Sequence, residues 1–105
     1  MSEELPIEHI QDHDIRGETR WTGYVKLSNG YRVGVLVLAV GDGLIAVRNR
    51  CPHRAVPLLQ GRLDQTAGTL ECPSHGWELP LVGSDLKGAP VVKRDGQWFL
   101  VRTAV

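Results

Sequence analysis

The sequence lacks an excess of charge of either sign. Twelve Lys and Arg residues balance twelve Asp and Glu residues over 105 positions. A protein that binds nucleic acid through bulk charge should carry a basic excess, and a polybasic contact with membrane lipid needs one too. The balanced composition therefore argues against nucleic-acid and membrane partners.

Long hydrophobic runs are also missing. The longest, Val33–Val40, has eight residues, whereas a membrane-spanning helix needs roughly 20. The first six residues, Met1–Pro6, are acidic in character and contain no apolar stretch of the kind found in a secretory signal peptide. These two features predict a soluble protein located in the cytoplasm.

Cysteine is scarce, with Cys51 and Cys72 as the only two. Two cysteines are enough for one disulfide, but a disulfide would not persist in a reducing cytoplasm. Each cysteine is followed by a histidine two or three residues later, namely His53 and His75. A histidine so close to each cysteine favours a metal site over a disulfide.

No segment shows convincing helical periodicity, which argues against a helical fold. Short runs rich in β-branched and aromatic residues alternate with turn signals such as Asn29-Gly30 and Asp95-Gly96. The pattern predicts an all-β fold, a small antiparallel sandwich or incomplete barrel. The expected strands are Leu5–Ile10, Arg20–Leu27, Tyr31–Val40, Leu44–Arg48, Arg62–Asp64, Thr69–Glu71, Trp77–Leu79, Val91–Arg94 and Gln97–Arg102.

Two segments stand apart from this framework. Residues 1–19 are polar and read as a short lead-in with one edge strand. Four of the six prolines lie between positions 52 and 80, and proline is excluded from central strands. We therefore expect residues 1–105 to form a single domain, with a loop-rich subdomain over about 50–80 inserted into the β framework.

The chemistry of the chain is concentrated in two mixed pairs. Cys51-x-His53 is followed by eighteen residues (54 to 71) and then by Cys72-x-x-His75. Thiolate suits zinc or an iron–sulfur centre, and imidazole suits iron, zinc or copper. A structural zinc site takes such a ligand set, although zinc fingers usually group cysteine with cysteine and histidine with histidine. A Rieske [2Fe–2S] cluster takes two cysteines on one iron and two histidines on the other, as mixed pairs would supply.

The residues around the pairs resemble a known family. Cys51-Pro52-His53-Arg54 and Cys72-Pro73-Ser74-His75-Gly76-Trp77 look like the two cluster-binding boxes of Rieske iron–sulfur domains. The second box is most similar to those of low-potential domains associated with ring-hydroxylating oxygenases and of related ferredoxins. The resemblance is strong over about 45–80. It implies that Cys51 and Cys72 hold the inner iron and that His53 and His75 hold the outer one.

The resemblance also implies a function. A Rieske ferredoxin is a one-electron carrier, here expected to pass electrons from a flavin-dependent reductase to a terminal oxygenase. It is not an enzyme by itself, and the chain offers no facial triad of iron ligands outside the boxes. Two alternatives stay open. One alternative is the small Rieske subunit of a larger reductase, such as a nitrite reductase. The other is a zinc-stabilised interaction module.

The sequence departs from the family pattern in places. The eighteen-residue spacer is slightly long, and Gln65–Gly68 resembles a turn that absorbs the excess. The positions that carry a bracing disulfide in respiratory-chain relatives are Val56 and Ser74 here. High-potential relatives have a serine and a tyrosine where this chain has Trp77 and Leu79. We therefore expect a potential near the bottom of the Rieske range, about −150 to +300 mV.

Overall fold

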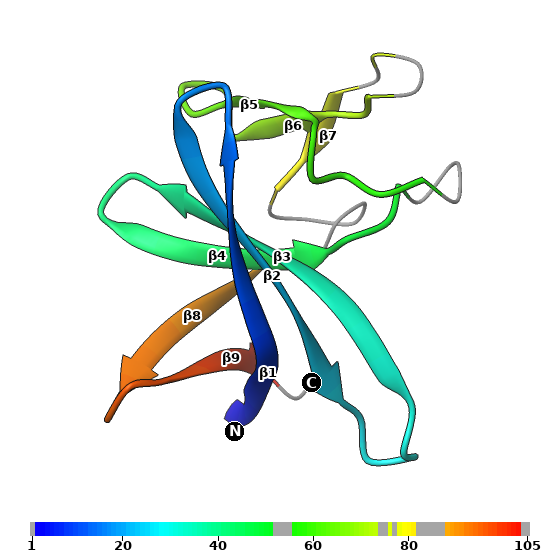
Figure 1. The fold of residues 1–105 in the computed structure, drawn as a ribbon, viewed down its shortest axis with the longest axis vertical. Helices are drawn as coiled ribbons and strands as arrows, with labels where there is room; N and C mark the ends of the chain where they lie inside the picture. The colour runs from blue at the N-terminus through cyan, green and yellow to red at the C-terminus, as the bar shows by residue number, and fades with distance from the viewer. Residues whose placement is uncertain (1, 52–55, 74–75, 77, 82–87, 104–105) are drawn as a thin grey trace.

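A computed structural model of the protein describes residues 2–51, 56–73, 76, 78–81 and 88–103. Six antiparallel strands form a closed barrel in the order β1-β2-β3-β4-β8-β9, and three short strands form a separate sheet in the order β5-β6-β7 (Figure 1). The barrel strands are β1 (Ser2–Ile15), β2 (Glu18–Lys26), β3 (Arg32–Val40), β4 (Gly43–Arg48), β8 (Ala89–Arg94) and β9 (Gln97–Thr103). The small sheet comprises β5 (Arg62–Asp64), β6 (Thr69–Glu71) and β7 (Glu78–Pro80).

The predicted all-β fold is confirmed, and no described residue belongs to a helix. Among the residues that the structure describes, none forms a helix of the length and apolarity that a membrane crossing would need.

Strand β3 joins the two hydrophobic cores of the molecule. Its four consecutive residues Val35–Leu38 are all buried, as expected for a run with apolar side chains on both faces. Val35 and Val37 pack into the barrel interior with Val25 and Leu100. Leu36 and Leu38 point to the other side and join a second core beneath the small sheet.

Strand β1 corrects the sequence interpretation of the N-terminal segment. It runs over Ser2–Ile15 instead of Leu5–Ile10, and it is not an edge strand because it pairs with both β2 and β9. The pairing of Ser2 with Thr103 closes the barrel that the sequence left incomplete. A register shift between Glu8 and Gln11 inserts one extra residue into β1.

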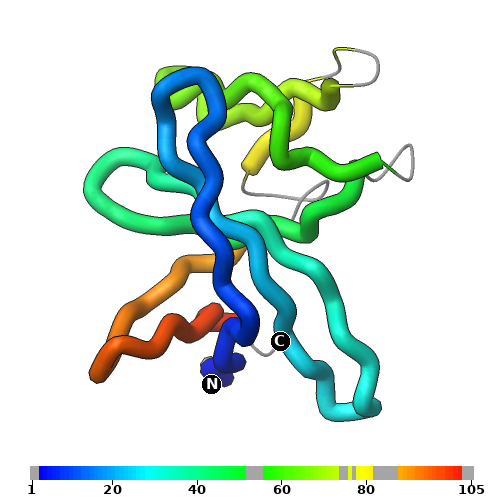
Figure 2. The backbone as a smooth tube through the Cα atoms, in the orientation of Figure 1, coloured from blue at the N-terminus to red at the C-terminus, as the bar shows by residue number. Residues whose placement is uncertain are grey.

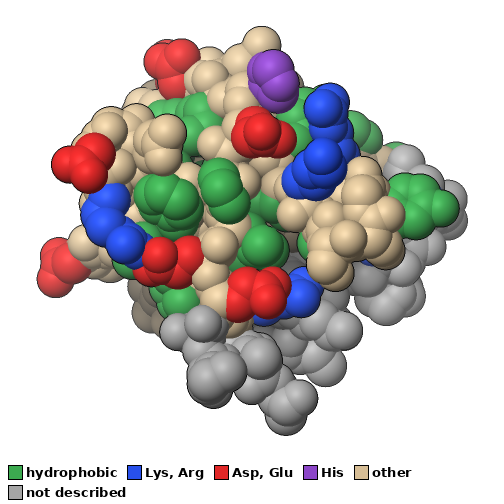
Figure 3. All heavy atoms as spheres, turned by 90° about the horizontal axis from the view of Figure 1, so that it is seen from below, with side chains coloured by type: hydrophobic (Ala, Val, Ile, Leu, Met, Phe, Trp, Pro, Cys, Tyr) green, Lys and Arg blue, Asp and Glu red, His purple; other side chains and the backbone are tan. Residues whose placement is uncertain are grey.

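The end of the barrel away from the small sheet combines apolar surface with paired charges. Viewed from below, hydrophobic side chains lie among acidic and basic ones (Figure 3). Arg102 lies 3.1 Å from Glu3, and Arg94 pairs with Glu4, which tie β9 and β8 to the first residues of β1. Exposed pairs of this kind contribute at most about 1 kcal/mol each.

Candidate metal centre

The first box begins where the chain leaves the barrel after β4. The backbone N–H of Asn49 donates to the carbonyl of Gly34 at 3.0 Å, which is the last contact with the β3 ladder. The N–H of Cys51 then donates to the carbonyl of Val56 at 2.9 Å. This hydrogen bond closes a short loop whose interior, residues 52–55, lies outside the described residues and contains the predicted ligand His53.

The second box begins where the chain leaves the small sheet after β6. Glu71 pairs with Glu78, so the box is the connection between two ladder partners. The N–H of Gly76 donates to the carbonyl of Cys72 at 2.9 Å, and Gly76 has φ near 70°, a conformation that favours glycine. The predicted ligand His75 lies outside the described residues, as does Trp77.

Both cysteines lie in the same core. Cys51 and Cys72 are 2% and 0% exposed and belong to one cluster of buried side chains, the one that β3 shares with the small sheet. They form no disulfide. The other members are Leu36, Leu38, Val47, Leu58, Leu70, Leu79 and Leu81.

This donor set fits a metal cluster held from its buried side. A thiolate in an apolar core is costly unless a cation or metal compensates its charge. Here two thiols from two separate loops lie in one apolar core, where a metal bound to both would compensate their charge. The remaining ligands would come from other residues of the two boxes. The described residues alone contain no group of three or more His, Cys, Asp and Glu side chains that could hold a metal ion.

The segment between the boxes is packed against both of them. The Oδ1 atom of Asn49 accepts the N–H of Leu58 at 2.9 Å, and Leu58 is completely buried. The chain then turns through a hydrogen bond from the N–H of Gly61 to the carbonyl of Leu58. A Cβ atom on Gly61 would overlap the carbonyl oxygen of Glu71, the residue before Cys72.

Two arginines of the β1–β2 hairpin contact this same segment. Arg20 is only 2% exposed and donates to the carbonyls of Leu59 and Gly61. Arg16 donates to the carbonyls of Gln60 and Gly61. Neither these contacts nor those of Asn49 could be predicted from the sequence. Their acceptors are backbone carbonyls up to 45 residues away from the arginines, and a carbonyl leaves no signal in a sequence.

A small hollow of about 210 Å³ lies between the hairpin and the second box. Its lining residues are Arg16, Gln60, Gly61, Arg62, Glu71, Cys72, Pro73 and Gly76.

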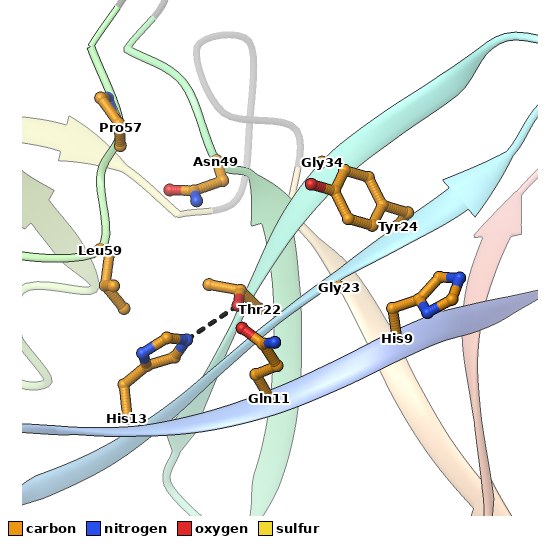
Figure 4. Close-up of a pocket in the computed structure, with 10 residues that line it drawn as sticks. All are labelled: His9, Gln11, His13, Thr22, Gly23, Tyr24, Gly34, Asn49, Pro57 and Leu59. Atoms are coloured by element: carbon orange, nitrogen blue, oxygen red, sulfur yellow. Dashed lines mark hydrogen bonds between the residues drawn. The ribbon is translucent and has the colours of Figure 1, made fainter.

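A larger hollow of about 400 Å³ lies on the outer side of β1–β3, between those strands and the segment that follows the first box (Figure 4). Here His13 shares a 2.8 Å hydrogen bond between its Nε2 and the Oγ1 of Thr22. His9 is exposed and meets the ring of Tyr24 edge to face at 6.5 Å between centroids. The two histidines outside the boxes are therefore occupied by barrel contacts.

Comparison with known proteins identifies the family. The family model of the Rieske [2Fe-2S] domain matches residues 7–103, which is most of the chain. The chain therefore belongs to the Rieske [2Fe-2S] domain family. Members bind a Rieske-type [2Fe–2S] cluster and serve as electron-transfer modules.

Curated relatives contain a similar segment within much longer chains. Methylxanthine N1-demethylase NdmA of Pseudomonas putida is 38% identical over 60 residues, covering 57% of this chain and 16% of its own. The 3-chlorobenzoate-3,4-dioxygenase oxygenase subunit of Comamonas testosteroni is 37% identical over 59 residues, covering 47% and 13%. Pheophorbide a oxygenase of Oryza sativa subsp. japonica is 54% identical over 33 residues, covering 31% and 6%.

This chain thus spans a sixth or less of the length of these relatives. No solved structure matches the chain.

Proposed function

We propose that Cys51, His53, Cys72 and His75 hold the [2Fe–2S] cluster, with the cysteines on the inner iron and the histidines on the outer. One observation carries the proposal: both cysteines are buried in one core although they come from separate loops. The backbone hydrogen bonds Cys51 to Val56 and Gly76 to Cys72 support it, since each constrains a loop that contributes one cysteine and one histidine. Residues 1–105 then form one domain, and the segment about 50–80 is its cluster-binding subdomain.

When bound, the cluster accepts and releases one electron at a time. The chain's own contribution is to exclude water from the inner side and to keep the ligands in place in both oxidation states. Leu58, Leu70 and Leu79, each at most 1% exposed, surround the cysteines and supply the apolar side. A rigid loop frame reduces the rearrangement that accompanies electron transfer, because ligands that are already fixed need not move.

We further propose that the domain is a ferredoxin that passes electrons from a flavin-dependent reductase to a terminal oxygenase. The support is the identity of the relatives, whose names describe oxygenases and demethylases. The cytoplasmic location expected from the sequence stays a prediction.

The ligand assignment is tested by assaying iron, zinc and acid-labile sulfide in protein purified without oxygen. We expect about two irons and two sulfides per chain, with a red-brown colour. Cys51→Ser, Cys72→Ser, His53→Ala and His75→Ala should each lose the cluster. His9→Ala is a matched control, because this histidine is exposed on the barrel and packs against the ring of Tyr24. One zinc per chain with no sulfide would contradict the proposal and favour the zinc-stabilised module.

The carrier role needs a separate experiment. Tagged protein is purified anaerobically from its native cells and sized. A diffusing ferredoxin elutes alone and is re-oxidised when the oxygenase fraction is added. Elution with a large partner at fixed stoichiometry would contradict the carrier role and indicate a fixed subunit, as in a larger reductase.

A further inference from the structure

The tip of the β1–β2 hairpin reaches from the barrel to the small sheet, where it meets the segment between the two boxes (Figure 2). Nη1 of Arg20 donates to the carbonyl of Leu59 at 2.6 Å and to that of Gly61 at 2.5 Å. Nη2 of Arg16 donates to the carbonyls of Gln60 and Gly61, both at 2.9 Å. Three consecutive carbonyls are therefore held by two guanidinium groups, and Gly61 is held by both.

The Arg20 side chain is itself fixed. Its Nε and Nη2 atoms lie 2.7 and 2.6 Å from Oε1 of Glu18, so the buried guanidinium is paired on one side and bound to carbonyls on the other. A buried charge is tolerated only with such compensation. The planar fork of arginine makes these contacts in one orientation, which lysine would not reproduce.

The held segment is linked to the residues that precede both boxes. On the upstream side, Leu58 is bound to Asn49, two residues before Cys51. On the downstream side, Gly61 lies directly against the carbonyl of Glu71, one residue before Cys72. A displacement of residues 59–61 would therefore be transmitted to the chain just before each cysteine.

We propose that Arg20, with Arg16 as a second contact, is a positioning residue for the cluster: it fixes residues 59–61 and thereby the separation of the two cluster-binding loops. This inference rests on the ligand assignment proposed above. The arginines act through the backbone carbonyls of residues 59–61. Arg16 also lines the 210 Å³ hollow to which the start of the second box contributes.

The test uses the cluster-loaded full chain and three variants. Arg20→Gln and Arg16→Gln remove the charged fork, and Arg102→Gln is the control, since it removes an arginine whose ion pair with Glu3 lies on the barrel. Iron release to a chelator is timed far below the unfolding temperature. The electron paramagnetic resonance spectrum of the reduced cluster is recorded, because its line widths report a spread of ligand geometries that a loss of stability alone would not produce.

We expect Arg20→Gln to release iron about tenfold faster, as loss of an outer-shell partner typically does. Arg16→Gln should release iron about threefold faster. The effect is smaller because the Arg16 side chain is exposed, so its hydrogen bonds to the two carbonyls contribute less than those of buried Arg20. Both should broaden the resonance lines, whereas Arg102→Gln should match the wild type. Because both arginines bind Gly61, the double variant should be non-additive.

Unchanged release rates and line widths in Arg16→Gln and Arg20→Gln would overturn the proposal. If Arg20→Gln does not fold, Arg16→Gln decides the question, since its side chain is exposed and its loss leaves no buried charge unpaired. A wild-type protein without a [2Fe–2S] cluster would overturn the ligand assignment and this proposal with it. A loaded wild type with unaffected variants would overturn only the positioning role.

Discussion

Gly61 and Glu71 approach each other so closely that a Cβ atom on Gly61 would overlap the carbonyl oxygen of Glu71. We predict that Gly61→Ala forces the segment between the boxes away from β6. Overpacking of this kind costs about 1–3 kcal/mol, which would lower the melting temperature by about 5–15 °C and lower the cluster content. Thermal unfolding and an iron assay measure the two effects.

Gly43→Ala is the matched control for that substitution. Gly43 starts β4, and a Cβ atom there would meet nothing within 4 Å. This variant should keep the wild-type melting temperature within a few degrees. Equal melting temperatures for Gly61→Ala and Gly43→Ala would contradict the close approach of Gly61 to Glu71.

Asn49 connects the end of β4 to the segment after the first box. Replacing it with alanine leaves the buried N–H of Leu58 without its acceptor, at a cost of about 1–3 kcal/mol. Asn49→Ala should therefore melt earlier, and the Leu58 amide should exchange its hydrogen faster. Asn49→Asp keeps an acceptor oxygen and should restore slow exchange; if it exchanges as fast as the alanine variant, the hydrogen bond is not what protects the amide.

Removal of the cluster should expose the two cysteines. Cys51 and Cys72 are at most 2% exposed in the structure, and in the loaded protein they should resist alkylation. Under the proposed ligand assignment, chelation of the reduced protein removes the link between the two loops, and the melting temperature should fall by about 10 °C or more. About two thiols per chain should then react. Alkylation at the same rate before and after chelation would show that the cluster does not protect these residues.

The reduction potential should lie near the bottom of the Rieske range. Leu79, at the position of a tyrosine in high-potential relatives, is 1% exposed in the core that contains both cysteines. It offers no hydroxyl to donate to a cluster sulfur, and such hydrogen bonds raise the potential. Protein-film voltammetry should give a midpoint below zero; a midpoint well above zero would show that other donors compensate.

Local chemistry made several strands predictable. The Asp95-Gly96 turn places both residues at positive φ, 51° and 77°, as the tight hairpin between β8 and β9 requires. The predicted strands Arg62–Asp64 and Thr69–Glu71 are found at those bounds. The third strand of the small sheet covers Glu78–Pro80 and ends one residue later than predicted, whereas its predicted first residue, Trp77, lies outside the described residues.

The sequence predicted an N-terminal strand over Leu5–Ile10, but its full length and its pairing on both sides could not be predicted, for two physical reasons. His9 has φ near 56°, and the extra residue between Glu8 and Gln11 interrupts the two-residue alternation that marks a strand. Closure of the barrel depends on pairing with β9, about a hundred residues away in the chain, and such pairing has no local signature. The exposed acids of β1 therefore looked like a solvated lead-in.

The sequence predicted the ligand residues of the candidate site, but not the residues that hold its loops in place. Ligand type and spacing pointed to Cys51 and Cys72, and the structure places both in one core. The predicted ligands His53 and His75 lie outside the described residues, so their roles stay a prediction. Arg20 gave no signal, because a lone arginine in a β-rich stretch reads as an exposed strand residue until its carbonyl partners are known.

Because of the β5–β6 hairpin, the number of residues between the two boxes does not determine how far apart the boxes lie in space. Arg62 pairs with Glu71, whereas the far end of the hairpin turns through Asp64, whose side chain accepts the N–H groups of Thr66 and Ala67. Residues inserted at that exposed turn would lengthen the spacer without moving the Arg62–Glu71 pair. The number of residues between two metal-binding boxes is therefore a weak criterion for family membership; what matters is whether the surplus folds back on itself.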